Sequence, residues 1–246
     1  FYTISDKNKF YNKKIDKKIN LIFLKKEKKY NNVIENKIII KILKKLINID
    51  FIIIDSNKFS YNPSNNILKN VNKIFQLNDI ITKGNRNRSI INPNFVKKTL
   101  NINYKYSFLG PKYSLVKKPT KSFISSNRIK KIKCINFFFG NSDTKNITFN
   151  ILNLLLNKLQ DKEINVIIGK NNINKNKIIE KFNNNKNINI FYNVKNIFKI
   201  LSKSDIAFGS PSFTQSERMA IGLPTLLISA NNEQLKIAKT IDKLGY

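Results

Sequence analysis

Short apolar segments alternate with amphipathic segments through the second half of the chain, and this alternation limits the possible folds more than any other feature. Each of five apolar segments is followed by residues with helical spacing of their apolar positions. The expected strands are Ile132–Phe139, Ile164–Gly169, Ile188–Tyr192, Asp205–Gly209 and Pro224–Ser229, and the expected helices are Asn146–Leu159, Asn176–Phe182, Val194–Ser204, Ser212–Ile221 and Asn232–Leu244. Short apolar strands joined by helices form parallel sheets covered on both faces. The sequence therefore predicts an α/β fold in which these strands end at one edge of a sheet.

The first half of the chain gives a weaker pattern of the same kind. Strands are expected at Ile19–Leu24, Ile49–Asp55 and Lys73–Asp79, a helix at Val33–Ile47, and a Gly-Pro turn within Tyr106–Pro119. A chain of 246 residues is long enough for two domains. We place the boundary in the polar stretch Pro119–Lys130, which gives domains at residues 1–122 and 123–246. The Asn/Lys tract Asn171–Asn187 is of low complexity, and we expect a solvated, loosely ordered helix and loop there.

The chain is strongly basic, with a formal net charge of +31. Such a charge is typical of proteins that bind nucleic acid or anionic membranes. However, only four of the 46 basic residues are Arg, and the Lys residues are scattered among Asn and Ile. These three residue types share A/T-rich codons, so a base bias would enrich them together. We therefore favour a solvated surface, and a basic nucleic-acid-binding protein stays as an alternative.

Composition also excludes several kinds of site. The chain has no His and one Cys, Cys134, beside an apolar run. A Ser-His-Asp triad and the usual zinc sites are thereby excluded, and we expect no metal. Cys134 is interpreted as a buried structural thiol, which fits a reducing compartment such as the cytoplasm. No apolar run approaches the roughly 20 residues of a membrane span. The oligomeric state stays open.

One stretch, Phe208–Pro224, departs from the Lys- and Asn-rich composition of the rest of the chain. A strand is expected to end at Gly209, and Ser210 or Ser212 can cap the next helix, with Thr214 and Glu217 matching a capping box. A helix start rich in small hydroxyl residues can also receive an anion, for which a diphosphate is suited. Glu217 could then accept hydrogen bonds from a ribose diol. The alternative is a well-capped helix with no ligand.

Two further polar clusters follow expected strands. Gly140, Ser142 and Asp143 come after the first strand of the second half, and Asp143 could also cap the following helix. Asn232 and Gln234 lie in a cluster after the last strand. Because parallel strands end at the same edge, the three clusters are expected to converge there.

The motifs "FFFGNSDTKNIT", "SDIAFGSPSFTQSERMAIGLPTLLIS" and "NNEQ", in this order, resemble the UDP-sugar hydrolases of pseudaminic acid biosynthesis. These enzymes cleave a UDP-linked diacetamido trideoxy altropyranose and are related to the glycosyltransferase family typified by MurG. The resemblance covers roughly Asp55 to Tyr246. It implies two Rossmann-like domains in a GT-B arrangement, with the nucleotide mainly on the C-terminal domain and no cofactor.

The resemblance also implies roles for individual residues. Matching substrate-binding positions are Gly140, Ser142 and Asp143 in the first loop, Gly209, Ser212 and Thr214 near the phosphates, Glu217 near the ribose, and Asn232 and Gln234 in the last cluster. Asn141 replaces a Gly of the family pattern, and Glu233 separates its adjacent Asn and Gln.

The catalytic residue is the main departure from the family. Its members carry a catalytic His in a Gly-rich loop after the first strand, and this chain has neither. Because the chain begins at Phe1 rather than Met, we expect a fragment that binds UDP weakly and hydrolyses little. If the chain nevertheless shows robust turnover, Asp55 is the first candidate for the base, and Asn232 is another possible catalytic residue. A GT-B glycosyltransferase is the alternative within the same fold.

Overall fold

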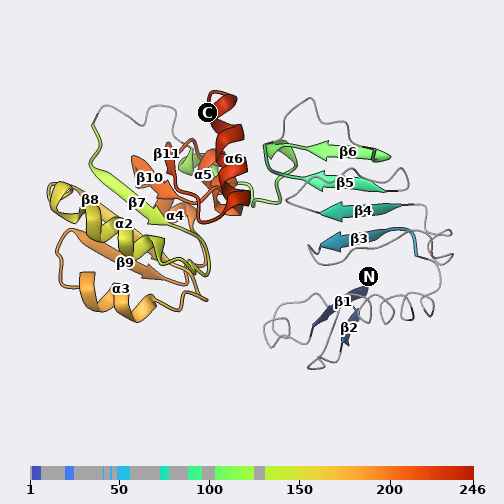
Figure 1. Cartoon of the computed structure of the whole chain (residues 1–246), viewed down its shortest axis with the longest axis horizontal. Helices are drawn as coiled ribbons and strands as arrows, with labels where there is room; N and C mark the ends of the chain where they lie inside the picture. The colour runs from blue at the N-terminus through green and yellow to red at the C-terminus, as the bar shows by residue number, and fades with distance from the viewer. Residues whose placement is uncertain are drawn as a thin grey trace. The chain divides into compact units, whose positions relative to one another are not determined.

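The computed structural model describes residues 2–6, 20–24, 41, 45, 49–55, 73–77, 88–95, 103–124 and 131–246. The chain divides into two compact units, one of Phe1–Asn92 with Asn101–Phe108 and one of Pro93–Leu100 with Leu109–Tyr246. The expected division into functional domains at residues 122 and 123 stays a prediction. Each unit is described by itself below (Figure 1).

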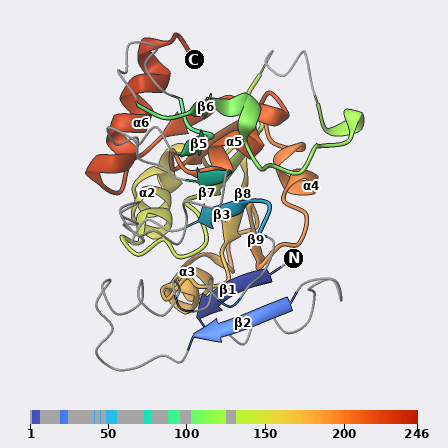
Figure 2. The same cartoon turned by 90° about the vertical axis from the view of Figure 1, so that its right-hand side faces the viewer.

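The described part of the first unit contains parallel strands. β1 (Tyr2–Asp6) pairs in parallel with β2 (Asn20–Leu24), as Figure 2 shows. A second sheet has the order β3-β4-β5-β6, from β3 (Ile52–Asp55), β4 (Ile74–Leu77), β5 (Ser89–Asn92) and β6 (Tyr106–Leu109). The strands expected within residues 19–24, 49–55 and 73–79 are confirmed. Of the helix expected at Val33–Ile47, only Lys41 and Lys45 are described, and both are helical.

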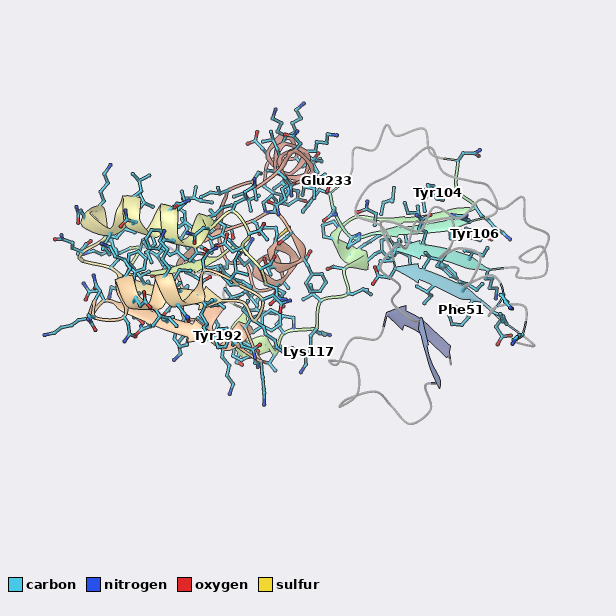
Figure 3. All side chains as sticks on the ribbon, turned by 60° about the horizontal axis from the view of Figure 1, so that its bottom comes forward. Phe51, Tyr104, Tyr106, Lys117, Tyr192 and Glu233 are labelled. Carbon is cyan, nitrogen blue, oxygen red and sulfur yellow. The ribbon has the colours of Figure 1, made fainter. Side chains whose placement is uncertain are left out.

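Aromatic side chains pack along this second sheet. The Phe75 ring lies edge-on to Phe51, with centroids 6.5 Å apart, and is tilted against Phe108 at 6.3 Å. Figure 3 labels Phe51, which directly precedes β3, and Tyr106, which begins β6. The Gly-Pro turn after β6 is confirmed: Gly110 has φ of 97°, and the 3₁₀ helix η3 (Pro111–Tyr113) follows it. A second 3₁₀ helix, η4 (Lys121–Phe123), lies farther along the chain.

Residues 131–246 form a five-stranded sheet with the order β11-β10-β7-β8-β9, all pairs being parallel. Its strands are β7 (Cys134–Phe138), β8 (Glu163–Ile168), β9 (Ile188–Tyr192), β10 (Ile206–Gly209) and β11 (Thr225–Leu227). All five strands were expected within a few residues. Numbered from β7, the order is 3-2-1-4-5, which is the Rossmann-like order of a doubly wound sheet.

Helices cover both faces of this sheet. Successive side chains of β7 point to opposite faces, so Phe137 and Phe138 pack against different helices. Phe137 packs in one cluster with Leu152 of α2 (Ile147–Leu155) and with Ile178 and Phe182 of α3 (Lys175–Phe182). The 3₁₀ helix η5 (Leu156–Lys158) continues α2. On the other face, Phe138 packs with Phe198 of α4 (Phe198–Leu201). The remaining helices are α5 (Phe213–Ala220) and α6 (Asn232–Lys243).

Two expectations for this unit differ from the structure. The helix expected at Val194–Ser204 is helical only in α4, because Asn193 turns into the left-handed region with φ of 51° and Val194–Ile197 form a loop. The Asn/Lys tract contains α3, whose Ile178 and Phe182 are fully buried. That helix is therefore anchored on the core rather than loosely ordered.

Candidate functional site

The loops after β7 and β10 start side by side at one edge of the five-stranded sheet. Phe138 at the end of β7 is in register with Gly209 of β10, and Gly209 with Leu227 of β11. The predicted convergence of these strand ends is thereby confirmed. From β7 the chain continues toward β8, and from β10 toward β11 on the other side. The two loops therefore diverge, and such a switch point is where open parallel sheets bind ligands.

A pocket of about 360 Å³ lies at this switch point. Three segments line it: the end of β7 and its loop (Phe138, Gly140, Asn141), the loop after β9 (Val194, Lys195, Ile197) and the start of α5 (Ser212, Phe213, Thr214, Glu217). Of the residues expected to bind substrate, Gly140, Ser212, Thr214 and Glu217 are therefore brought together. The loop after β9 was missed, because its apolar spacing resembles that of a helix.

Glycines shape the loop after β7. Gly140 has φ of 95°, a conformation that a side chain disfavours. A Cβ at Gly169, after β8, would lie within 2.6 Å of three backbone atoms of Asn141, so this glycine lets the loop fold over the end of β8. The Asn171 N–H donates to the Asn141 carbonyl at 3.1 Å and fastens the loop there. The backbone of Gly140 and Asn141 thus forms a fixed wall of the pocket.

Asp143 caps α2, as one of its two expected roles required. Its Oδ1 accepts from the Ile147 N–H at 2.8 Å, its Oδ2 accepts from the Thr148 N–H at 3.0 Å, and its side chain is buried. Both carboxylate oxygens therefore have backbone partners. Asp143 and the exposed Ser142 do not line the pocket.

The start of α5 is not capped as the sequence suggested. Ser212 occupies the N-cap position with extended backbone, but its side chain makes no cap hydrogen bond. The hydroxyls instead bond to one another: Ser210 to Ser212 at 3.1 Å, and Ser212 to Thr214 at 3.3 Å. Within the described residues, the first-turn N–H groups of α5 thus lack a side-chain acceptor. An uncapped helix start next to a pocket favours an anionic ligand.

The buried side chain of Arg218 contacts two of these three hydroxyl-bearing residues, Ser210 and Thr214. Its side chain is fully buried, and Nη1 donates to Thr214 Oγ1 at 3.1 Å. Nη2 donates to the Ser210 carbonyl at 2.7 Å, and both Nη2 and Nε donate to Gln215 Oε1. No carboxylate in the described part of the chain forms an ion pair with it. Burial lowers the pKa of Arg218 to about 10, so the guanidinium stays charged at neutral pH.

Sequence reasoning missed Arg218 as part of this arrangement. A weak signal was present, since Arg is rare among the basic residues of this chain. Arg218 differs from the many Lys residues in its guanidinium fork, which donates several hydrogen bonds in fixed directions.

Glu217 gives the pocket its carboxylate. Burial raises the pKa of Glu217 above its ordinary value of 4.5, and the nearby charge of Arg218 offsets part of this rise. Within the described residues the Glu217 carboxylate has no hydrogen-bond donor, so the expected capping box with Thr214 is not formed. A partly buried carboxylate without a donor is suited to accepting hydrogen bonds from a ligand.

The remaining candidates lie elsewhere. At the start of α6, Asn231 caps the Gln234 N–H at 2.9 Å, and Gln234 Oε1 accepts from the Ala230 N–H at 2.7 Å. Asn232 is exposed, and neither Asn232 nor Gln234 lines the pocket. Asp55 ends β3 in the first unit and is exposed. The described residues contain no group of three or more His, Cys, Asp or Glu side chains that could hold a metal ion. None of the described helices has the length and apolarity needed to cross a membrane.

Comparison with known proteins gives one distant relative. No family model matches the chain. An uncharacterized protein of the archaeon Methanocaldococcus jannaschii is 30% identical over 134 residues. The match covers 52% of this chain but only 28% of that protein. The match therefore spans little more than a quarter of the relative's length.

Proposed function

We propose that this chain binds a UDP-sugar and belongs to a hydrolase that releases UDP from an acetamido deoxy sugar. The observation that carries the proposal is a pocket that brings together the uncapped start of α5 with Ser212, Thr214 and Glu217. A nucleoside diphosphate offers matching groups: an anion for the helix start and a ribose diol for the carboxylate.

The proposed reaction is attack of water at the anomeric carbon, with UDP as the leaving group. Negative charge grows on the diphosphate as the glycosidic C–O bond breaks, and the N–H groups of α5 would stabilise that charge. The attacking water loses a proton to a general base, which we place on the first unit, with Asp55 as the first candidate. We further propose that the two parallel α/β units form a GT-B pair.

The Rossmann-like strand order supports the nucleotide role of the second unit. Doubly wound sheets bind ligands in the crevice at the switch point, and Ser212–Thr214 lie at a helix start beside it. The apolar side chains of Val194, Ile197 and Phe213 in the same pocket offer a surface for a nucleobase.

Calorimetric titration with UDP tests the proposal. We expect one UDP per chain at physiological salt, and no comparable heat with uridine plus free phosphate. Absence of UDP binding to the folded protein contradicts the proposal. Release of free sugar from the UDP-sugar without any acceptor indicates hydrolysis, whereas release only with an acceptor alcohol indicates a glycosyltransferase. If sugar is released, loss of turnover in Asp55→Asn with unchanged UDP affinity would assign the base.

A further inference from the structure

A buried cation lies directly behind the hydroxyl groups of the pocket. The Arg218 side chain has no exposed surface, and its Nη1 contacts Thr214, whose own side chain lines the pocket. A single hydroxyl group thus connects the guanidinium with the pocket. Burying a charge costs free energy unless hydrogen bonds compensate for it, so this placement calls for a reason beyond packing.

The hydrogen bonds of Arg218 set the direction of the whole chain. A guanidinium can only donate, so Thr214 Oγ1 must accept from Nη1 and directs its own hydrogen elsewhere. The neighbouring acceptor in the structure is Ser212 Oγ at 3.3 Å, and because Thr214 lines the pocket, a ligand bound there would offer another. Hydrogen bonds in such a chain polarise one another, so the Thr214 hydroxyl becomes a stronger donor.

The Ser210 carbonyl is fixed by the same side chain. It accepts from Arg218 Nη2 at 2.7 Å and from the Ser212 N–H at 2.9 Å. This carbonyl is therefore directed toward the buried guanidinium, and its negative end is neutralised there. The contact thereby holds the segment that leads into α5 in place.

We propose that Arg218 is a positioning residue for a diphosphate group: it makes Thr214 a hydrogen-bond donor toward the pocket and supplies the buried positive charge behind it. This inference rests on the proposed function, because it assumes that the start of α5 receives the diphosphate. Beyond the proposed function, the inference names Arg218 as the residue that makes the start of α5 bind an anion in preference to a neutral ligand. Arg218 acts through Thr214 and does not touch the substrate.

Inorganic pyrophosphate is the probe, titrated calorimetrically at physiological salt into the wild type and variants. We expect Thr214→Val to weaken pyrophosphate binding about tenfold or more, and Thr214→Ser, which keeps the hydroxyl, to stay within about twofold. Arg218→Gln should also weaken it about tenfold or more. Lys158→Gln is the charge-matched control, since this exposed residue lies in η5, before β8 and away from the pocket.

The double variant decides whether Arg218 acts through Thr214. If it does, the loss in Thr214→Val/Arg218→Gln is smaller than the product of the two single losses. Losses that multiply, or a folded Arg218→Gln variant that binds pyrophosphate like Lys158→Gln, overturn the inference. A purely structural role would lower the melting temperature of Arg218→Gln without coupling to Thr214.

A second measurement leaves Arg218 intact. With four Arg in the chain, the side-chain ¹⁵N spectrum is sparse. We expect the guanidinium signals of Arg218 to shift on addition of pyrophosphate in the wild type, and to shift much less in Thr214→Val. Unchanged Arg218 signals at saturating pyrophosphate overturn the inference even if Arg218→Gln does not fold.

Failure of this inference is distinguishable from failure of the proposed function. Coupled binding of pyrophosphate without binding of UDP would keep the role of Arg218 and overturn the nucleotide assignment. Tight UDP binding that is insensitive to both Thr214→Val and Arg218→Gln would keep the proposed function and overturn the role of Arg218.

Discussion

The guanidinium of Arg218 fills the space that a side chain at Gly209 would need. A Cβ at Gly209 would lie 2.5 Å from Nη1 and 2.6 Å from Cζ of Arg218. Gly209 is in register with Phe138 of β7 at the switch point. Gly209, at the end of β10, thus makes room for the buried side chain of Arg218. The predicted role of Gly209 in binding the substrate stays a prediction.

Gly209→Ala should therefore destabilise the protein. The added methyl group must displace the guanidinium, and overpacking of this kind costs about 1–3 kcal/mol. Urea unfolding measures the free energy directly. The cost should shrink in an Arg218→Gln background, because the shorter side chain leaves space. Equal costs in both backgrounds would mean that strand geometry, not Arg218, excludes the side chain.

Asp143→Ala should lower stability and leave UDP binding nearly unchanged. The substitution removes the acceptor of two N–H groups at the start of α2, and loss of an N-terminal cap costs about 0.5–2 kcal/mol. Thermal unfolding and UDP titration of the same variant separate the two roles. A large loss of UDP affinity with unchanged stability would return Asp143 to the substrate-binding residues that the resemblance implied.

The pH dependence of stability should reveal the burial of Glu217. Its pKa in the folded protein is raised above 4.5, so the folded state binds the proton more tightly than the unfolded state. Stability from this group is fully present below about pH 4.5 and is lost as pH rises through the folded pKa. Glu217→Gln should thus melt at a higher temperature than the wild type at neutral pH, with the difference shrinking toward pH 4. A difference independent of pH would contradict the raised pKa.

Much of the second unit could be predicted from its sequence, because burial on both faces leaves apolar runs that base bias does not erase. β7 and β8 each lie in such an apolar run. Their parallel pairing could be expected because helices connect the strands. The same bias misled us elsewhere. Asn136 and Asn165, which pair in register on β7 and β8, are buried, so Asn is not confined to the surface of this unit. The α3 helix is anchored by two buried residues inside a tract of Asn and Lys.

The site was predictable where it depends on strand ends and obscure where it depends on tertiary contacts. Gly140, Ser212, Thr214 and Glu217 follow strands of one sheet, so their convergence could be expected. The choice between capping and ligand binding at Ser212 depends on Arg218, six residues later, drawing the hydroxyls into another network. Spacing along a sequence cannot distinguish these alternatives, because both use the same residue types at a helix start.

Glu217→Ala should weaken UDP binding without lowering stability. Its carboxylate lines the pocket and caps nothing, so its expected donors are the two hydroxyls of a ribose. Hydrogen bonds to a charged acceptor contribute about 1.5–3 kcal/mol, which corresponds to a loss of about one to two decades in affinity. Free uracil, which lacks the ribose, should bind the variant and the wild type alike. Glu180→Ala on α3, an exposed carboxylate outside the pocket, is the matched control for the change in charge. Equal UDP affinity in the folded Glu217→Ala and Glu180→Ala variants would end the ribose assignment.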